Sequence, residues 1–311
     1  MRITLIHNPG AGRHGEGELE RLLRFMKDAG HEVRHRSSKD EGWTACLDES
    51  ADLIAVAGGD GTVSRVAKRV RGRGTPIAPL PAGTANNIST TLGLVGRPLE
   101  ELVRGWAEAR HIKLDLGVAE GPWGRRYFLE GVGAGLFAAA ADVAPKEKLP
   151  SKPEDKVKWA IRNLRQRLLE MKAVRIDASL DGEDVSGEYV LFEALNIPFV
   201  GPNLFLAPDS RQGDGQLDLV MATEAERARL AHYLEHWEEK KPRLAVLPSR
   251  QGRLLRMELA RERMHIDDEF WPEDAAAAEA KPPAPVEVRI EDAAVDFLAP
   301  ADLQAPGKKK R

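Results

Sequence analysis

The sequence contains little cysteine, few aromatic residues and no long apolar run. Its 311 residues include one cysteine, Cys46, which excludes an intramolecular disulfide framework and a structural zinc site built from several thiolates. Aromatic residues make up 5% of the chain, which argues against a platform on which the bases of single-stranded nucleic acid stack. No apolar segment approaches the roughly 20 residues that a membrane-spanning helix needs.

An excess of charge of one sign is also missing. The chain has 46 basic and 49 acidic residues, a net charge of −3, which excludes a surface that is basic all over, and we expect no nucleic-acid partner. The first residues, Met1 to Pro9, lack the basic flank and long apolar stretch of a signal peptide. Because 42% of the residues are apolar, enough for a substantial core, we expect a soluble cytoplasmic protein.

Strands and helices are predicted to alternate in the first part of the chain. Apolar runs of strand length end in glycine-containing turns, and segments with the apolar spacing of amphipathic helices follow them. The predicted strands are residues 2–6, 32–36, 53–57 and 77–80. This order predicts an α/β protein whose N-terminal domain, residues 1–116, is a doubly wound parallel sheet. Ligands of such sheets bind at the carboxyl ends of the strands, where the glycine turns lie.

The pattern changes after about residue 112. Strand-like runs follow one another closely up to residue 298, and two predicted helices, residues 155–171 and 224–238, interrupt them. This pattern predicts a mostly antiparallel, β-rich second domain over residues 117–299. Residues 300–311 form a basic tail.

The first glycine cluster, Gly10 to Gly15, matches the G-x-G-x-x-G pattern of dinucleotide-binding turns. The pattern alone is weak, because a turn in any doubly wound sheet can carry it. A ribose-binding acidic residue belongs at the end of the second strand, where this chain has Arg36 followed by two serines. Since an arginine suits the 2′-phosphate of NADP, an NADP-dependent oxidoreductase stays open as an alternative.

The second and third clusters are more specific. Gly58 to Thr62 lies between an apolar strand and a helix, where glycines let main-chain N–H groups approach a phosphate and the helix N-terminus favours negative charge. Thr62 is expected to cap the helix or bind a phosphate oxygen, and Asp60 to act through Mg²⁺ or on a hydroxyl. Pro81 to Asn87 repeats the arrangement after the fourth strand, so the two turns would flank one ligand.

In these turns the chain resembles the diacylglycerol kinase catalytic-domain family, which includes bacterial lipid kinases and sphingosine kinases and is related to NAD kinases. The first turn carries the resemblance through Asn8 to Gly12. The second domain carries it through Leu114 to Gly117, Phe128 to Gly135 as a strand and a glycine-rich turn, Pro208 to Asp218 as a metal-binding loop, and Ile266 to Glu269 in place of the family's Asp-Gly-Glu motif. The motifs follow one another in the family's order and together span nearly the whole chain, which makes the signal specific.

The resemblance implies an ATP-dependent kinase that transfers the γ-phosphate to the hydroxyl of a diacylglycerol-type or related lipid. It implies Glu269 as the general base, with Asp267 and Asp115 completing an acidic network, and Asp60 as the other candidate for the base or for a metal-organising residue. The nucleotide-binding residues that it implies are Asn8, Pro9, Gly10, Ala11, Gly12, Ser38, Gly58, Gly59, Asp60, Gly61, Thr62, Ser64 and Thr84.

A bound Mg²⁺ is the second cofactor that the resemblance implies, held by Asp214 and by the main-chain carbonyls of Arg211 and Gln216. The chemistry is consistent, because phosphoryl transfer depends on positioning and charge neutralisation, and a loop that offers only oxygen suits a hard cation. From its residues alone, the Asp214-Gly215 pair favours a plain turn before a strand.

The chain departs from the family pattern at three places. Ser64 and Arg65 replace an Asn-Glu pair, Asn87 replaces an aspartate, and Asp268 replaces the glycine of Asp-Gly-Glu. Aspartate adopts the left-handed conformation of such a turn more readily than most residues do. The sequence Gly58 to Thr62, which NAD kinases share, keeps an NAD kinase-like enzyme open as an alternative. The departures at Ser64, Arg65 and Asn87 motivate another, a nucleotide-binding regulator without catalytic activity.

A basic helix suggests how such an enzyme would meet a lipid. The predicted helix 155–171 carries Val157, Ile161, Leu164 and Leu168 on one stripe and basic residues elsewhere. One interpretation packs the stripe against the second domain. The other places the helix at a membrane surface, so that the enzyme is cytoplasmic and transiently peripheral to the membrane. A homodimer stays open as a further alternative.

Overall fold

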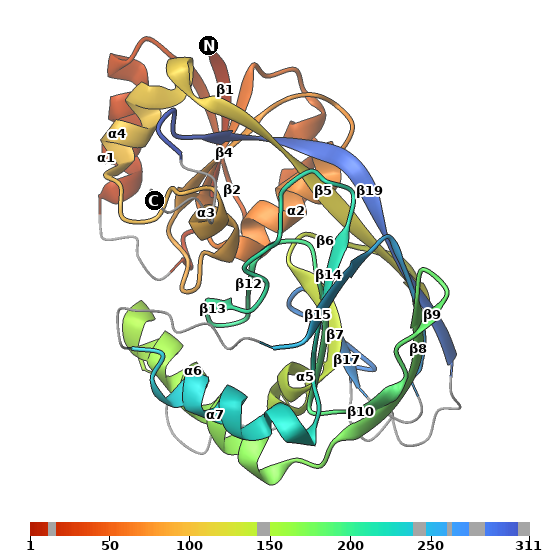
Figure 1. Ribbon diagram of the computed structural model, residues 1–311. Helices are drawn as coiled ribbons and strands as arrows, with labels where there is room; N and C mark the ends of the chain where they lie inside the picture. The colour runs from red at the N-terminus through yellow and green to blue at the C-terminus, as the bar shows by residue number, and fades with distance from the viewer. Residues whose placement is uncertain (12–16, 142–149, 239–246, 260–262, 274–283, 304–311) are drawn as a thin grey trace. The chain divides into compact units, whose positions relative to one another are not determined.

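The structure, a computed structural model, describes residues 1–11, 17–141, 150–238, 247–259, 263–273 and 284–303 (Figure 1). Contacts divide the chain into two compact units, Met1–Asp115 with Ala293–Arg311, and Leu116–Asp292. The division differs from the expected ranges at the C-terminal end. Residues 293–299 were expected in the second domain, but they belong to the first unit, because strand β19 (Ala284–Ala299) continues into it.

The first unit contains a parallel sheet with the strand order β19–β4–β3–β1–β2. The register pairs β1 with β2 and with β3, and β3 with β4, all in parallel, and Phe297 of β19 lies beside Ile77 of β4. Its strands are β1 (Arg2–His7), β2 (Glu32–Ser37), β3 (Leu53–Gly58), β4 (Ile77–Pro81) and the first part of β5 (Arg110–Gly121). Its helices are α1 (Glu18–Asp28), α2 (Asp60–Val70), α3 (Asn87–Thr91) and α4 (Leu99–Arg104), with two short 3₁₀ helices, η1 (Trp43–Asp48) and η2 (Gly105–Glu108).

Burial explains why these segments form this sheet. All six residues of β3 are buried, as expected for a parallel strand that is covered on both faces. Helix α1 packs beside α4, and α2 packs against β3 (Figure 1, red to yellow). The carboxyl ends of β1, β3 and β4 therefore present the three loops that the sequence singled out at one edge of the sheet.

The second unit is mostly antiparallel. One sheet pairs β10–β8–β16–β19, and a second, six-stranded sheet has the order β15–β14–β11–β7–β17–β18. The remaining strands are β6 (Gly124–Phe128), β7 (Gly131–Gly135), β8 (Val174–Leu180), β9 (Glu183–Asp184), β10 (Gly187–Tyr189), β11 (Leu191–Leu195), β12 (Phe199–Val200), β13 (Leu204–Phe205), β14 (Leu217–Ala222), β15 (Ser249–Gly252), β16 (Leu254–Leu259), β17 (Met264–Ile266) and β18 (Glu269–Trp271). Its helices are α5 (Leu136–Ala141), α6 (Pro153–Glu170), η3 (Glu224–Glu226) and α7 (Arg227–Glu235).

The six-stranded sheet buries both of its faces. Phe192 and Ala194 of β11 belong to a core cluster between the two sheets, with residues of β8, β16 and β19. Leu191 and Leu195 of the same strand belong to a second cluster, which α5, α6 and α7 cover. Because side chains alternate along a strand, Glu193 shares the helix-covered face with these two leucines.

The segment Gly131–Gly135 was expected to form a glycine-rich turn, but it is strand β7 at the centre of this sheet. It pairs with β11 on one side and with β17 on the other. Its glycines serve close packing, because a Cβ added at Gly133 would lie 2.1 Å from Oε2 of Glu193 and 2.4 Å from the main-chain oxygen of Phe192. A glycine-rich sequence therefore marks a crowded strand here.

Helix α6 packs its apolar stripe against the second unit, which is the first of the two interpretations of the sequence. Its stripe of Val157, Ile161, Leu164 and Leu168 is buried in the core cluster beneath the helices. Two of its basic side chains pair with acidic residues at and just beyond the end of α7, Lys158 with Glu238 at 3.2 Å and Arg165 with Glu235 at 3.1 Å. Among the described residues, no helix combines the length and the apolar character that crossing a membrane requires.

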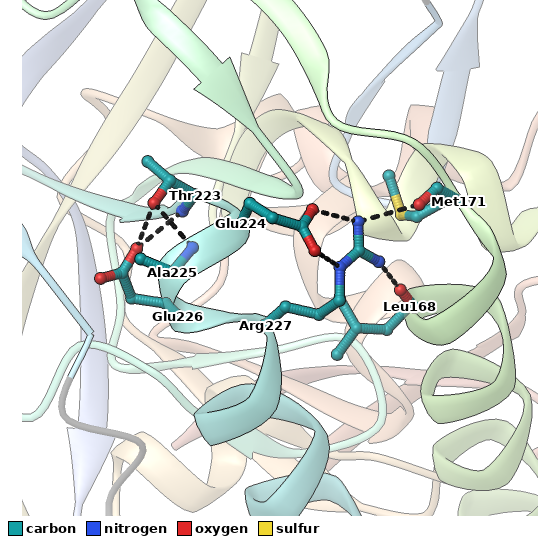
Figure 2. A network of polar contacts seen from close by, with 7 residues as sticks. All are labelled: Leu168, Met171, Thr223, Glu224, Ala225, Glu226 and Arg227. Atoms are coloured by element: carbon teal, nitrogen blue, oxygen red, sulfur yellow. Dashed lines mark hydrogen bonds and ion pairs between the residues drawn. The ribbon is translucent and has the colours of Figure 1, made fainter.

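One arginine joins the C-terminus of α6 to the start of α7 (Figure 2). The guanidinium of Arg227 donates hydrogen bonds to the main-chain oxygens of Leu168 and Met171, the latter at 2.9 Å, and to both carboxylate oxygens of Glu224 at 2.7 Å. These carbonyls have no partner within the helix, because the last turn of a helix leaves its carbonyl oxygens unpaired. The flat, forked guanidinium reaches several acceptors at once, which a lysine cannot do.

We expect Arg227→Lys to lower the free energy of unfolding by about 2 kcal/mol, because hydrogen bonds from a charged group contribute more than neutral ones. Urea unfolding followed by circular dichroism measures the change. Arg162→Lys, on the exposed side of α6, is the matched control and should leave stability unchanged. Equal stability of the two variants would contradict this role of Arg227.

Candidate active site

Asn8 organises the first loop of the parallel sheet. Its Oδ1 accepts a hydrogen bond from the main-chain N–H of Gly10 at 3.0 Å, which closes the turn after β1. Its Nδ2 donates to Oγ1 of Thr62 at 3.2 Å, at the start of α2. The loops after β1 and β3 are therefore tied together by one amide side chain. Thr62 makes no side-chain cap of its own helix, and it is buried.

The second and third loops touch at two glycines. A Cβ built on Gly83 would lie 2.4 Å from the Cα of Gly59, and one built on Gly59 would lie 2.9 Å from the Cα of Gly83. Both distances are shorter than a real Cβ tolerates, and the obstacle is backbone. The glycines at these two positions are therefore explained by the contact between the loops. The main-chain groups of Gly83 are held further by Asn86, whose side-chain amide accepts from its N–H and donates to its carbonyl, each at 2.9 Å.

Asp60 is committed to the third loop. Its Oδ1 accepts the main-chain N–H of Ile88 at 3.0 Å, in the first turn of α3. Burial raises the pKa of this carboxyl above its ordinary value, although hydrogen bonds from the main-chain N–H groups of Ile88, Asn87 and Asn86 oppose the shift. Asp60 thus links the start of α2 to the start of α3, and its carboxylate already accepts hydrogen bonds from main-chain N–H groups.

The other residues expected to bind nucleotide lie at this same edge or beside it. Ser38 follows β2 and is buried, and its Oγ has no hydrogen-bond partner within the described structure. Ser64 is buried in α2, Thr84 is half-buried in the third loop, and Pro9 and Gly10 are exposed. Ala11 is buried, and Gly12 lies outside the described residues.

The second unit presents a carboxylate in a nest of main-chain donors. Asp267 lies in the turn between β17 and β18, and its carboxylate accepts the N–H groups of Leu129 at 3.1 Å and of Glu130 at 2.9 Å. The residue of this turn in the left-handed conformation is Asp267 itself, with φ of 50°, and not Asp268 as the sequence suggested. The turn is therefore anchored through a side chain that reaches back to the segment before β7.

Glu269, the expected base, is exposed and paired with a residue that the sequence did not single out. One of its carboxylate oxygens lies 2.7 Å from Nη1 of Arg126 on β6, and 59% of its side chain is exposed. No local pattern around Arg126 could have predicted this pair, because 143 positions separate the two residues. Asp115 belongs to the first unit, where it is buried and its Oδ1 accepts the N–H of Ala293 at 2.5 Å.

The expected metal loop is rich in negative charge. Asp214 closes its own turn by accepting the N–H of Gln216 at 3.0 Å, and Arg211 is exposed in the same loop. Asp218 is buried, and burial, followed by the charges of Asp214 and Asp209, raises the pKa of its carboxyl, against hydrogen bonds that lower it.

Asp292 was missed by the sequence analysis. Its Oδ1 lies 2.7 Å from where a Cβ on Gly215 would be, so it adds a further acidic group beside the loop. Within the described ranges, no three His, Cys, Asp or Glu side chains are grouped so that they could hold a metal ion by themselves. Main-chain oxygens would therefore have to complete a cation site. Burial is the main cause of the raised pKa of Asp218, and the negative charges of Asp214 and Asp209 add to it. A cation in this loop would relieve that repulsion.

The comparisons with known proteins agree on one family. Residues 2–119 match the family model of the diacylglycerol kinase catalytic domain, and residues 130–298, more than half of the chain, match that of the YegS C-terminal NAD kinase beta sandwich-like domain. The chain belongs to the diacylglycerol kinase catalytic-domain family. The diacylglycerol kinase of Bacillus subtilis (strain 168) is 28% identical over 247 residues, which cover 75% of this chain and 76% of that protein. Membership of this kinase family supports a phosphotransferase activity.

Solved structures have the same type of fold. A diacylglycerol kinase from Bacillus anthracis str. Sterne is 20% identical and gives a TM-score of 0.68, over 96% of each chain. Yeast NADH kinase complexed with NADH gives a TM-score of 0.51 at 9% identity, over 96% of this chain and 83% of that chain. The predicted α/β class, with an N-terminal parallel sheet and a mostly antiparallel β-rich part after it, is confirmed.

We expect Gly83→Ala to lower the free energy of unfolding by about 2 kcal/mol, because overpacking a tight contact costs this much and the obstacle is backbone. Thermal unfolding measures the loss. Gly105→Ala is the matched control in the same unit, since nothing lies within 4 Å of its added Cβ and its φ is −77°. If Gly83→Ala is as stable as the control, the two loops do not pack as described.

We expect Asp218→Asn to stabilise the protein at pH 8 and to leave it unchanged near pH 3. Because the pKa of Asp218 is raised in the folded protein, folding favours its protonated carboxyl. This stabilisation is fully present at pH values below the ordinary pKa of aspartate, and it is lost as pH rises through the pKa of the folded protein. Asn keeps an oxygen that accepts the hydrogen bond of 3.0 Å from Gln251.

Urea midpoints between pH 3 and pH 8 measure this effect. Asp209→Asn should act in the same direction but less, because its exposed charge is one of the minor contributions to the raised pKa of Asp218. A wild-type and an Asp218→Asn profile that run in parallel over this range would contradict the assignment.

Proposed function

We propose that the protein is an ATP-dependent kinase that transfers the γ-phosphate to the hydroxyl of a lipid of the diacylglycerol type or a related lipid. The observation that carries the proposal is the locked edge of the parallel sheet, where three loops are joined by Asn8, by the contact of Gly59 with Gly83, and by Asp60. A rigid arrangement of main-chain donors at strand ends suits phosphate, because it needs no reorganisation when the anion binds. The family membership and the name of the Bacillus subtilis relative support the same activity.

ATP is proposed to bind along this edge of the first unit. The turn from Asn8 to Ala11 leaves Pro9 and Gly10 exposed, and Gly59 to Gly61 lies at the N-terminus of α2, whose partial positive charge favours a phosphate. Ser38 offers a buried hydroxyl with no partner among the described residues, the kind of group that a bound ligand satisfies.

Glu269 is the better candidate for the general base. A base needs a carboxylate that can approach the reacting hydroxyl. Glu269 has one that is well exposed, and within the described part of the chain only Arg126 holds it. The carboxylates of Asp60 and Asp267 already accept hydrogen bonds from main-chain N–H groups of their own units. We therefore assign Asp60 an organising role for the loops of the first unit, and Asp267 the same role for the turn that carries Glu269.

Mg²⁺ is proposed to bind in the loop before β14. Asp214 and the main-chain oxygens of Arg211 and Gln216 would hold it, in a region where the neighbouring acids Asp209 and Asp218 leave negative charge to be balanced. The cation supplies charge neutralisation when it is bound. Asp214 already orders this loop through its hydrogen bond to the N–H of Gln216, so its carboxylate is held in place within the loop.

Transient contact with a membrane surface follows from a lipid acceptor. The apolar stripe of α6 is used by the core, so the helix does not have a free apolar side to insert into a bilayer. Any contact through α6 would therefore rest on its charges, such as the exposed Arg162.

The deciding experiment incubates the protein with labelled ATP and Mg²⁺ in mixed micelles that contain diacylglycerol or a sphingoid base, with NAD, and without an acceptor. We expect label to enter the lipid, and Glu269→Gln to lower kcat by at least about 100-fold, the usual effect of removing a general base. Asp268→Asn is the matched control, because it removes the neighbouring exposed charge from the same turn and should keep activity.

Two outcomes would contradict the proposed lipid kinase activity, and a third would contradict the proposed role of Glu269. Transfer to NAD in place of lipid would identify an NAD kinase-like enzyme. Binding of ATP without transfer to any acceptor would identify a regulator. Lipid transfer that survives Glu269→Gln would remove Glu269 from the chemistry while leaving the kinase activity in place.

A further inference from the structure

A buried ion pair spans the central strand of the six-stranded sheet. Gly133 of β7 pairs with Glu193 of β11 on one side and with His265 of β17 on the other, so the three residues form one row across the sheet. Gly133 has no side chain, and Glu193 and His265 meet across it, with Oε2 of the glutamate 2.8 Å from Nε2 of the histidine. The pair could not form over any other residue, since a Cβ there would lie 2.1 Å from the same Oε2.

The pair lies fully inside the unit. The side chain of Glu193 is 0% exposed and that of His265 is 4% exposed, and the ring of Phe137 from α5 stands edge-on to the imidazole with centroids 5.6 Å apart. Burial raises the pKa of Glu193. Burial alone would lower the pKa of His265, but the charge and hydrogen bond of Glu193 and the main-chain oxygen of Asp267 raise it overall.

The second ring nitrogen of His265 contacts the turn that carries Asp267 and Glu269. Nδ1 lies 3.1 Å from the main-chain oxygen of Asp267, and a carbonyl oxygen can only accept, so Nδ1 carries a proton. This holds whether Nε2 donates to an ionised Glu193 or accepts from a protonated one. One side of Asp267 is thus held through its carbonyl by His265, and the other side through its carboxylate by the N–H groups of Leu129 and Glu130.

This arrangement would be costly if it served packing alone. Two apolar side chains of similar volume usually stabilise a core at least as well as a buried ion pair does, because charges lose their hydration. The chain instead keeps a glutamate, a histidine and a glycine matched in one row, and the imidazole contacts the one turn that carries Asp267 and Glu269. The pair fixes the ring so that Nδ1 points at that turn.

We propose that His265, oriented by Glu193, is a positioning residue that holds the turn Asp267–Glu269 in its working geometry. The proposal rests on the proposed function for the role of Glu269 in phosphoryl transfer. It does not depend on that function for the contact itself. The exposed part of the turn, where the described residues provide the ion pair of Glu269 with Arg126, depends on this buried support.

The test separates the two nitrogens of the ring. In a Glu193→Gln background, which avoids an unpaired buried charge, His265→Asn keeps an amide nitrogen near the place of Nδ1. His265→Gln moves the amide toward the place of Nε2 and loses the donor to Asp267. Tyr189→Phe is the control, because it removes a buried hydrogen bond of 2.7 Å, to the oxygen of Val185, elsewhere in the same unit.

Two measurements are made on the full chain. Amide hydrogen exchange at Leu129 and Glu130, which donate to Asp267, should be about tenfold faster with His265→Gln, and within about twofold of the Glu193→Gln background with His265→Asn. In the lipid kinase assay, His265→Gln should lower kcat about tenfold with KM for ATP unchanged, whereas His265→Asn should restore most of kcat.

Exchange at these two amides that is equal in the two double variants, or no faster than in Tyr189→Phe, would overturn the positioning role. Equal losses of kcat in both double variants would overturn it too, since a merely structural pair would not distinguish the nitrogens. The exchange measurement needs no activity. Absence of lipid transfer by the unaltered protein would therefore reject the proposed function without deciding the role of His265.

Discussion

Carboxylates that accept main-chain N–H groups fix the positions of the loops on which any chemistry of this protein depends. An ionised carboxylate has several acceptor sites and forms stronger hydrogen bonds than a neutral group, so one side chain can tie a distant segment in place. Among the described residues, five aspartates do so across long stretches of sequence: Asp52 to Arg2, Asp60 to Ile88, Asp115 to Ala293, Asp181 to Arg253 and Leu254, and Asp267 to Leu129 and Glu130. Without these links, the loops at the strand ends would lose hydrogen bonds that join them to segments far away in the sequence.

Glycines set the second constraint, because several main-chain segments approach one another more closely than a side chain permits. Gly59 and Gly83 let the loops after β3 and β4 touch, and Gly133 makes room for Glu193 and His265. A glycine-rich sequence at a strand end is easily taken as evidence of a bound phosphate. Here the same glycines are already required by contacts within the protein, so the case for a nucleotide rests on the locked and partly exposed edge they produce and on the family membership.

The sequence predicted what depends on local pattern and missed what depends on register. The all-apolar strand β3 and the stripe of α6 could be found, because each is a repeat within one segment. The pairing of Arg126 with Glu269 could not, since side chains far apart in sequence meet only once the strands are aligned. The glycines of Gly131–Gly135 were misread as a turn for a related reason, because the crowding that they relieve comes from two other strands. The return of residues 293–299 to the first unit is likewise a matter of which strand they pair with.

The choice between Asp60 and Glu269 as base follows from how each carboxylate is used. A group that removes a proton must keep a lone pair directed at the acceptor hydroxyl, and main-chain donors compete for that lone pair. Asp60 accepts from α3, and moving it would release the loop that Asn86 and Gly83 also hold. Among the described residues, Glu269 is held by one ion pair, to the half-buried Arg126. Because the side chain of Glu269 is 59% exposed, a substrate can displace this pair at small cost. In the proposed function, the rigid carboxylates therefore set the geometry, and the loosely held Glu269 is the proposed base.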